Sequence, residues 1–216
     1  MSKNILILSG PTHEYFDPVR FIGNASSGLM GKALAEEALA RGYSIYFITG
    51  PVADSNLPNL GSAGQVFPVT SAEEMLQQAE LLFPSSAITI LAAAVADYAP
   101  SKKLDEKMAK SEAGLTLQLR ATPDIAKTLG DTKRTDQITI GFALQTNDGK
   151  INARRKLKNK NLDGIILNTP ASLGAKNGLF SFLSAESNSF DEWGCINKNE
   201  CAHQIFQQVE KIIRGR

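Results

Sequence analysis

The chain has 216 residues, of which 43% are hydrophobic and 21% are charged, and its formal net charge is +1. This composition is ordinary for a soluble globular protein. The nearly neutral charge gives no case for nucleic acid or a membrane surface as a partner. No apolar run approaches the roughly 20 residues that a membrane helix needs, and the short run after the N-terminus is no signal peptide. We therefore expect a cytoplasmic protein.

Short apolar strands alternate with helical segments over the first half of the chain. The pattern predicts strands at 4–9, 43–49, 65–69 and 87–94, and helices at 26–41 and 71–82. Ser26 or Ser27 is expected to cap the first helix, and Ser71 with Glu74 forms a capping box for the second. The alternation predicts an α/β fold with a mostly parallel, Rossmann-like sheet and helices on both faces.

The pattern changes after Asp97. Residues 98–122 are polar and rich in lysine, and then place Leu115, Leu117 and Leu119 on one face, which predicts an antiparallel flap that leaves the sheet. The remaining pattern predicts a helix opened by Pro123 and Asp124, strands at 138–142, 163–167 and 179–183, helices at 148–161 and 197–214, and a return strand or loop from 189. We expect a single domain over 1–216, with the flap as its only candidate subdomain.

A serine- and glycine-rich stretch, Ser26 to Gly31, stands at the start of the first predicted helix. Free N–H groups and the positive end of the helix dipole favour an anion there, so Ser26, Ser27 and Gly28 are candidate phosphate-binding residues. A tight helix start with glycines for packing explains them equally well, because a lone Gly-x-x-Gly is a weak signal.

Arg20 and Asn24 stand in the loop just before this stretch. An arginine suits bidentate binding of carboxylate or phosphate. An asparagine offers neutral donors to a charge that develops on an oxygen.

A run of alanines, Ala92 to Ala94, ends the fourth predicted strand and is followed by Asp97. Ligands of open α/β sheets bind beyond the carboxyl ends of the strands, where small side chains let a ligand approach the backbone. Close helix packing explains the alanines equally. Asp97 is a candidate Mg²⁺ ligand, or it caps the next turn.

Two basic clusters are candidates for surrounding a triphosphate, although a solvated surface explains any single lysine as well. One cluster lies on the flap and the other on the predicted helix at 148–161; their members are Lys102, Lys103, Lys107 and Lys110, and Lys150, Arg154, Arg155, Lys156, Lys158 and Lys160.

Tyr98 and Lys102 have the Tyr-x-x-x-Lys spacing of short-chain dehydrogenases, which keeps an NAD(P)-dependent short-chain oxidoreductase as an alternative. Pro100 opposes the helix that this pair needs. The second predicted strand also ends without an acidic residue for a ribose. We therefore interpret the spacing as accidental.

Several motifs occur together and in order: "DPVRFIGNASSGLMGKALAEEALARG", "AAVADYAP", "EKMAK", "LRATPDI", "GFALQTN" and "KNKNLDGIILN". Over roughly residues 5–168 the chain resembles the phosphopantothenoylcysteine synthetase family in its bacterial form. The resemblance implies a ligase that joins 4'-phosphopantothenate to L-cysteine through an acyl-cytidylate, with CTP and Mg²⁺, and a homodimer whose flap lies near the subunit interface. Such chemistry needs positioning and charge stabilisation rather than an enzyme nucleophile. A non-catalytic nucleotide-binding relative remains an alternative.

The resemblance also implies roles for individual residues. Asn24 matches the asparagine that holds the acyl-nucleotide, Arg20 the arginine of the second half-reaction, and Lys107 the flap lysine that meets the phosphates. The positions that match further nucleotide contacts are Leu91, Ala92, Ala93, Asp97, Pro123, Asp124, Ile125, Ala126, Phe142, Lys156 and Lys160.

The chain departs from the family pattern at four places. Ala25 replaces a histidine, Ala109 replaces a lysine, Thr122 replaces an asparagine and Gln145 replaces a glutamate. These departures bear on phosphate affinity and on the choice of nucleotide. The chain begins at the first strand of the synthetase, so we expect the flavin-dependent decarboxylase of the same pathway to be a separate protein. Cys195 and Cys201 lack a usual zinc spacing and are expected to be structural or incidental thiols.

Overall fold

The computed structural model describes residues 4–110, 112, 114–145, 147–170 and 175–216. Within them, an eight-stranded sheet forms the centre of the molecule, in the order β12-β11-β10-β9-β6-β1-β4-β5. Its strands are β1 (Asn4–Ser9), β4 (Ser44–Thr49), β5 (Gly64–Pro68), β6 (Ile88–Leu91), β9 (Ile138–Leu144), β10 (Gly164–Asn168), β11 (Asn177–Ser184) and β12 (Asp191–Asn197). The strands from β10 to β5 run parallel, whereas β11 and β12 are antiparallel to their neighbours. The predicted α/β fold class is confirmed.

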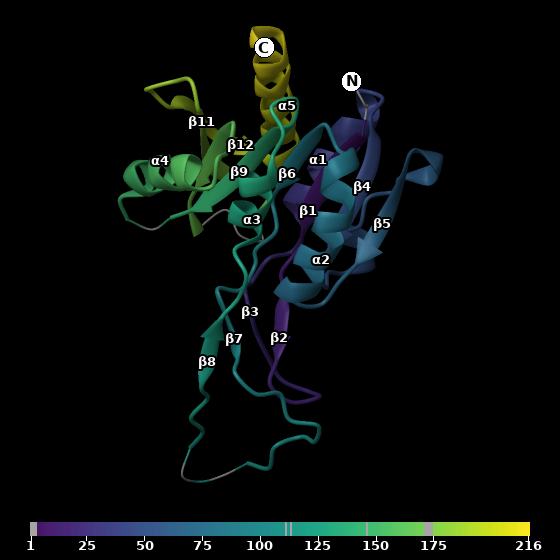
Figure 1. Cartoon of the computed structure of the whole chain (residues 1–216), viewed down its shortest axis with the longest axis vertical. Helices are drawn as coiled ribbons and strands as arrows, with labels where there is room; N and C mark the ends of the chain where they lie inside the picture. Colours follow the sequence, from purple (N-terminus) through teal and green to yellow (C-terminus); the bar gives the residue numbers. More distant parts are fainter. Residues whose placement is uncertain (1–3, 111, 113, 146, 171–174) are drawn as a thin grey trace.

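Helices cover both faces of this sheet (Figure 1). The helices are α1 (Leu29–Ala40), α2 (Ala72–Leu82), α3 (Ile125–Thr132), α4 (Gly149–Asn159) and α5 (Lys198–Gly215), with 3₁₀ turns at Asp54–Asn56, Gly61–Ala63 and Phe83–Ser85. Alternate residues of β1 feed two apolar cores, because side chains of a strand point to opposite faces. Ile5 and Ile7 pack with α1 and α5, whereas Leu6 and Leu8 pack with α2, α3 and α4.

The order of the strands creates a crevice between β1 and β6. From β1 the chain adds β4 and then β5 on one side, and it adds β6, β9 and β10 on the other side. The direction of winding therefore changes between β1 and β6, and ligands of such sheets bind beyond the carboxyl ends of the strands at this point. The segments after Ser9 and Leu91 border that position.

The start of α1 differs from the expected serine cap. Gly28 is the N-cap residue, with a left-handed φ of 77°, and no side chain caps the helix. A Cβ on Gly28 would lie 2.8 Å from Val52 Cγ1, and one on Gly31 would lie 2.0 Å from Ser9 Oγ. Gly28 therefore allows the left-handed turn before α1, and Gly31 lets α1 pack directly against β1. The local sequence could not distinguish this packing role from phosphate binding.

Four short strands form an arm that projects from the carboxyl end of the sheet (Figure 1). They pair as two antiparallel hairpins, β2 (His13–Tyr15) with β3 (Phe21–Gly23) and β7 (Tyr98–Pro100) with β8 (Leu119–Ala121). The predicted antiparallel flap outside the main sheet is confirmed by the pairing of β7 with β8. Its leucines do not form a buried face, because Leu115 and Leu119 are 53% and 45% exposed. Tyr98 lies on a strand, so the Tyr-x-x-x-Lys spacing forms no helical pair.

Two further boundaries were predicted wrongly. β6 ends at Leu91 rather than at residue 94, and beyond it only an isolated parallel bridge between Ala94 and Pro11 continues the pairing with the chain after β1. Pro123 lies before α3 rather than in its first turn, and Asp124 is the cap, accepting a hydrogen bond from Lys127 N.

Among the described residues, no helix combines the length and the apolar character needed to cross a membrane.

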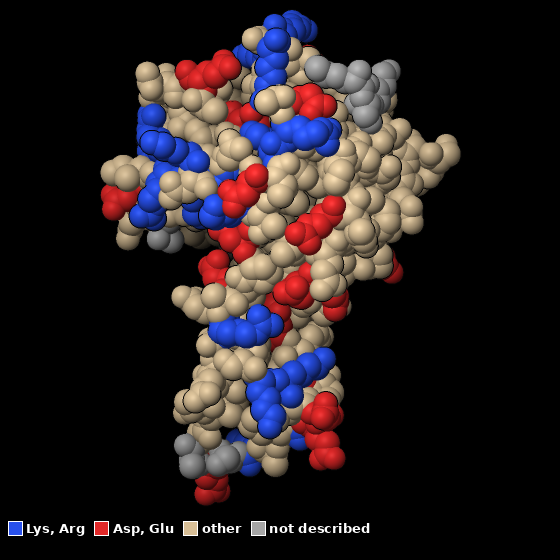
Figure 2. Space-filling view, viewed as in Figure 1, with Lys and Arg blue, Asp and Glu red and all other residues tan. Residues whose placement is uncertain are grey.

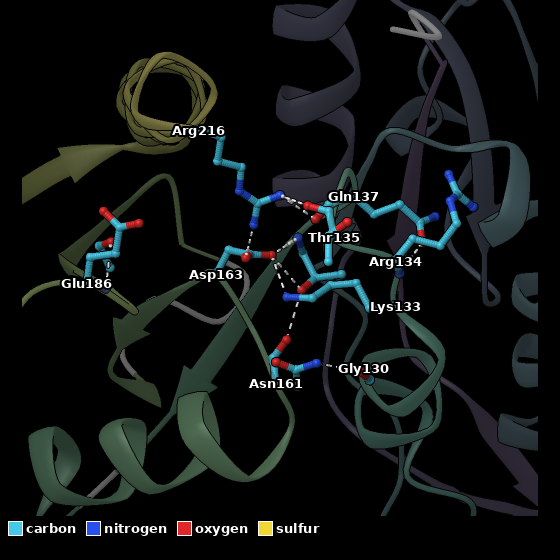
Figure 3. Close-up of polar contacts among 11 residues, drawn as sticks. Gly130, Lys133, Arg134, Thr135, Gln137, Asn161, Asp163, Glu186 and Arg216 are labelled. Atoms are coloured by element: carbon cyan, nitrogen blue, oxygen red, sulfur yellow. Dashed lines mark hydrogen bonds and ion pairs between the residues drawn. The ribbon is translucent and has the colours of Figure 1, made fainter.

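Asp163, just before β10, joins several elements through polar contacts, which Figure 3 shows in close-up. Its buried carboxylate accepts from Lys133 Nζ at 2.8 Å, from Thr139 N at 2.7 Å and from the guanidinium of Arg216. Asn161 Nδ2 donates to the carbonyl of Gly130 at 2.9 Å. These bonds tie the end of α3 and the end of α5 to the turn between α4 and β10.

Candidate active site

A cleft of about 570 Å³ lies beyond the carboxyl ends of β6 and β9. It is lined by Leu8, Asn24, Ala25, Leu91, Ala93, Ala94, Val95, Asp97, Thr122, Pro123, Asp124, Ile125, Ala126, Gly141, Phe142, Leu144, Lys156, Lys160, Leu162 and Ile165. The cleft therefore lies beside the crevice that the change of winding creates. It also brings together segments that are far apart in the sequence.

One wall of the cleft is the chain that leaves β6. Ala92 N donates to Leu8 O at 2.9 Å and Ala94 N donates to Gly10 O at 2.8 Å, so this segment runs beside the end of β1. The amide of Asn24 donates to Ala94 O at 3.3 Å and to Val95 O at 2.9 Å. The exposed side chain of Asn24 is thereby held at the mouth of the cleft, above small residues that leave the backbone accessible.

The opposite wall is basic and is built by the start of α3 and the end of α4. Lys160 Nζ donates to Asp124 Oδ1 at 2.8 Å. Burial acts to raise the pKa of Asp124, but the hydrogen bond from Lys160 and the N–H of Lys127 outweigh it, so this pKa lies below its ordinary value. The pKa of Lys156 is lowered, first by burial and then by the charge of Lys160. Asp97 is exposed on the rim.

A smaller hollow of about 130 Å³ adjoins the cleft at the start of α1. It is lined by Ser26, Ser27, Gly28, Leu29, Met30, Gly31, Ala92, Ala93, Ala94, Phe142, Leu144, Asn168, Phe180 and Lys198. The helix-start residues therefore lie beside the cleft rather than in it, and Phe142 contributes to both spaces. Because Ala93, Ala94 and Leu144 also line both, the two spaces are neighbouring parts of one candidate ligand site.

Arg20 and Lys107 lie outside both sets of lining residues. Arg20 Nη1 donates to Asp17 Oδ2 at 2.9 Å and to Met108 O at 3.1 Å. Asp17, whose side chain is fully buried, also accepts from Met108 N at 3.2 Å. In this structure Arg20 therefore attaches the flap segment around Lys107 to the base of the arm.

Sequence reasoning missed three polar residues that line the site: Thr122 was noted only as a departure, and Asn168 and Lys198 were assigned no role. Asn168 ends β10, and its position just past a predicted parallel strand was a usable signal. Lys198 opens α5 and reaches the hollow from 170 residues beyond Gly28, a relationship that no local pattern encodes.

The structure places the four departures and the cysteines as follows. Ala25 and Thr122 line the cleft. Ala109 lies on the flap, and Gln145 Oε1 accepts from Asn152 Nδ2 at 3.2 Å. Cys195 is exposed, whereas burial raises the pKa of the Cys201 thiol to about 12. Cys201 therefore stays protonated and is no nucleophile.

A metal site built from protein side chains alone is not found among the described residues, because no three His, Cys, Asp or Glu side chains cluster there. Asp97 nevertheless presents a carboxylate at the cleft. Mg²⁺ is commonly held by one or two carboxylates together with substrate phosphates. The carboxylate of Asp97 fits the arrangement in which substrate phosphates supply the other ligands of the ion.

The sheet and the cleft define an α/β protein of the Rossmann-like class, with its ligand site beyond the carboxyl ends of the parallel strands. The chain belongs to the family described as the DNA/pantothenate metabolism flavoprotein C-terminal domain, whose model matches residues 1–213. The family resemblance drawn from the motifs is thereby confirmed. The matches give no support to a short-chain oxidoreductase or to a non-catalytic relative.

Individual relatives agree with this assignment. The chain is 43% identical over 216 residues to the coenzyme A biosynthesis bifunctional protein CoaBC of Bacillus subtilis (strain 168), covering 98% of the chain and 52% of that protein. It is 39% identical over 215 residues to a cysteine/cysteine sulfinic acid decarboxylase of an unknown prokaryotic organism, covering 98% of the chain and 59% of that protein. The chain thus spans little more than half the length of these relatives.

A solved structure matches nearly the whole chain. It is the C-terminal domain of the coenzyme A biosynthesis bifunctional protein CoaBC, with a TM-score of 0.82 and 32% identity, covering 99% of this chain and 96% of that one. The chain therefore corresponds to that C-terminal domain in fold and extent.

Proposed function

We propose that this domain is a phosphopantothenate–cysteine ligase of coenzyme A biosynthesis, which uses CTP. The observation that carries the proposal is the composition of the cleft. The sequence motifs named eleven positions as further nucleotide contacts, and ten of these eleven residues line the cleft. These ten are Leu91, Ala93, Asp97, Pro123, Asp124, Ile125, Ala126, Phe142, Lys156 and Lys160, whereas Ala92 lines the adjoining hollow. Membership of the family supports the same reaction.

The proposed reaction has two steps. The carboxylate oxygen of 4'-phosphopantothenate attacks the α-phosphorus of CTP, the bond to the β-phosphate oxygen breaks, and pyrophosphate leaves. The amine of L-cysteine then attacks the carbonyl carbon of the acyl-cytidylate, the acyl carbon–oxygen bond breaks, CMP leaves, and the amine loses its proton. Both steps need positioned donors and cations rather than a nucleophilic side chain.

The residues take roles that follow from their places. Asn24 lies at the mouth of the cleft, where its amide can donate to the acyl-cytidylate in place of the carbonyls of Ala94 and Val95. Lys156 and Lys160 offer positive charge to the nucleotide, and Phe142 offers a ring face for the base. Asp97 would hold Mg²⁺ together with the nucleotide phosphates; the ion supplies charge neutralisation there.

Arg20 and Lys107 belong to the arm and do not line the cleft of their own chain. We propose a homodimer assembled through the arm. Apolar side chains that are unusually exposed there support this: Val19 at 57%, Phe21 at 43%, Tyr98 at 57%, Leu115 at 53% and Leu119 at 45%. Such exposure of several apolar side chains on one part of a protein is typical of a protein–protein contact. Sedimentation equilibrium tests it, and a monomer at assay concentrations argues against it.

The test of the reaction is a pyrophosphate-release assay. The protein is incubated with 4'-phosphopantothenate and L-cysteine and with either CTP or ATP, and pyrophosphate is measured. We expect release with CTP that depends on 4'-phosphopantothenate, and formation of CMP that depends on cysteine. Absence of release with both nucleotides contradicts the ligase proposal.

A further inference from the structure

A second hollow, of about 340 Å³, lies against the basic wall of the cleft. It is lined by Asp124 and Lys127 from the start of α3 and by Arg155, Lys156, Asn159 and Lys160 from the end of α4. Figure 2 shows basic side chains gathered on the α4 side of the molecule. Asp124, Lys156 and Lys160 line both this hollow and the main cleft, so the hollow borders the cleft.

The charges around this hollow are not balanced. Four cationic side chains line it, against a single carboxylate, Asp124, which is already paired with Lys160. Among the residues that the structure describes, neither Arg155 nor Lys156 has a carboxylate within ion-pair distance; Arg155 Nη2 donates to the neutral Asn152 Oδ1 at 3.1 Å. Lys156 is therefore held, half-buried, beside another ammonium group.

Lys127 is the fourth cationic side chain of the hollow, and its present ion pair with Asp131 is weak. Its ammonium lies 2.8 Å from Asp131 Oδ2, but the two side chains are 53% and 56% exposed. An exposed pair one helical turn apart contributes little to stability, because water screens both charges. Lys127 can therefore turn toward an anion in the hollow at small cost.

The helix dipole of α4 explains only part of this arrangement. Cations near the last turn of a helix are favourable because of the negative end of the dipole. Lys158, which is exposed and lies in that turn, satisfies this requirement without facing the hollow. The burial of Lys156 next to Lys160 is unfavourable for the charged form of Lys156, and a bound anion would offset it.

We propose that this hollow is a phosphate subsite, in which Arg155 and Lys127 bind phosphoryl oxygens in addition to Lys156 and Lys160. The planar guanidinium of Arg155 suits two oxygens of one phosphate group, and the amide of Asn159 is a further donor. The inference rests on the proposed function for the source of the phosphate, which is the polyphosphate chain of the nucleotide, the released pyrophosphate or the phosphomonoester of the acid substrate.

The test is calorimetric titration with inorganic pyrophosphate of the wild type, Arg155→Gln and Lys127→Gln. Lys158→Gln is the matched control, because it removes the same charge from the same helix outside the hollow. We expect Arg155→Gln to weaken binding by about 10-fold, the loss of one charge-assisted contact, and Lys127→Gln by somewhat less. Lys158→Gln should change it by less than about two-fold, since a screened surface charge acts weakly. Equal losses in Arg155→Gln and Lys158→Gln overturn the subsite.

Three further titrants identify the source. If Arg155→Gln loses affinity for CTP but not for CMP, the hollow binds the polyphosphate chain of the nucleotide. If it loses affinity for 4'-phosphopantothenate, the hollow binds the phosphomonoester of that substrate. If it loses affinity for pyrophosphate alone, the hollow binds the released product. Unchanged affinity for all of them overturns the proposal. A wild type that binds pyrophosphate through Arg155 but releases none in the ligase assay contradicts the proposed function and leaves the subsite standing.

Discussion

The ammonium group of Lys160 donates to the carboxylate of Asp124 at 2.8 Å, across 36 residues of sequence. The bond joins the last turn of α4 to the N-cap of α3 and forms the basic wall of the cleft. Gly130 makes this approach possible, because a Cβ there would lie 2.0 Å from Lys160 O. The basic wall is therefore a junction at which α3 packs closely against the end of α4. The close approach of Gly130 to the backbone of Lys160 positions the lysine.

The N-cap role of Asp124 gives a first prediction. Asp124→Ala removes the side-chain oxygen that accepts from Lys127 N and should lower the free energy of unfolding by about 1 kcal/mol. Asp124→Asn keeps a good capping residue and serves as the control, losing only the ion pair with Lys160. Urea denaturation measures both. Equal stabilities of the two variants would contradict the capping role.

The amide of Asn24 gives a second prediction, which depends on the proposed function. Asn24→Asp replaces a donor to two carbonyls by a carboxylate and places negative charge beside a phosphorylated intermediate. We expect kcat/KM to fall about 100-fold, the size of one lost donor to a developing charge. Because Asn24 is exposed, the midpoint of thermal unfolding should hardly move. Unchanged kinetics would remove Asn24 from intermediate binding.

Lys107 on the flap gives a third prediction. Lys107→Gln should slow turnover by about 100-fold, because it removes a cation expected to meet the phosphates. Lys103→Gln is the matched control, since Lys103 is another exposed flap lysine with the same charge. Steady-state pyrophosphate release measures both. A Lys107→Gln rate equal to that of Lys103→Gln would exclude a specific role.

The buried carboxylate of Asp17 predicts a dependence on pH. Burial acts to raise its pKa, but N–H groups of Val19, Arg20 and Met108 and the charge of Arg20 hold it below the ordinary value of 3.8. A lowered folded-state pKa means that the carboxylate stabilises the folded protein fully above the ordinary value. That contribution is lost as pH falls through the folded-state pKa.

Asp17→Asn tests this dependence. We expect the free energy of unfolding of the wild type to decline more steeply than that of Asp17→Asn as pH falls from about 5 to about 3, where carboxylates protonate. Urea denaturation at each pH measures it. Parallel declines would show that Asp17 carries no linked proton.

The junction at Asp163 gives a prediction about stability alone. Asp163→Asn leaves the buried ammonium of Lys133 without its counter-charge, and loss of one partner of a buried pair costs about 3–5 kcal/mol. Asp136→Asn is the control, because its pair with Arg134 is exposed and should contribute less than about 1 kcal/mol. Guanidinium denaturation compares the two. Similar small losses would contradict a structural role for Asp163.

Local patterns in the sequence determined most of the elements. The apolar run of β1, closed by Gly10 and Pro11, was predicted at its observed bounds. The capping box of α2 is present, with Ser71 Oγ accepting from Glu74 N at 3.2 Å. Such features depend on residues a few positions apart. The motifs also named most residues that line the cleft, because several of them follow a strand whose carboxyl end faces it.

Tertiary structure alone decided the rest. The strands β2 and β3 are three residues each, too short for a periodic pattern, and they form by pairing with each other, so the sequence predicted a loop there. Arg20 pairs with the loop at Met108, which is 88 residues away. Gly28 rather than a serine begins α1, because Val52 leaves no space for a side chain there. These relationships depend on atoms brought together by the whole fold, and no periodicity or spacing records them.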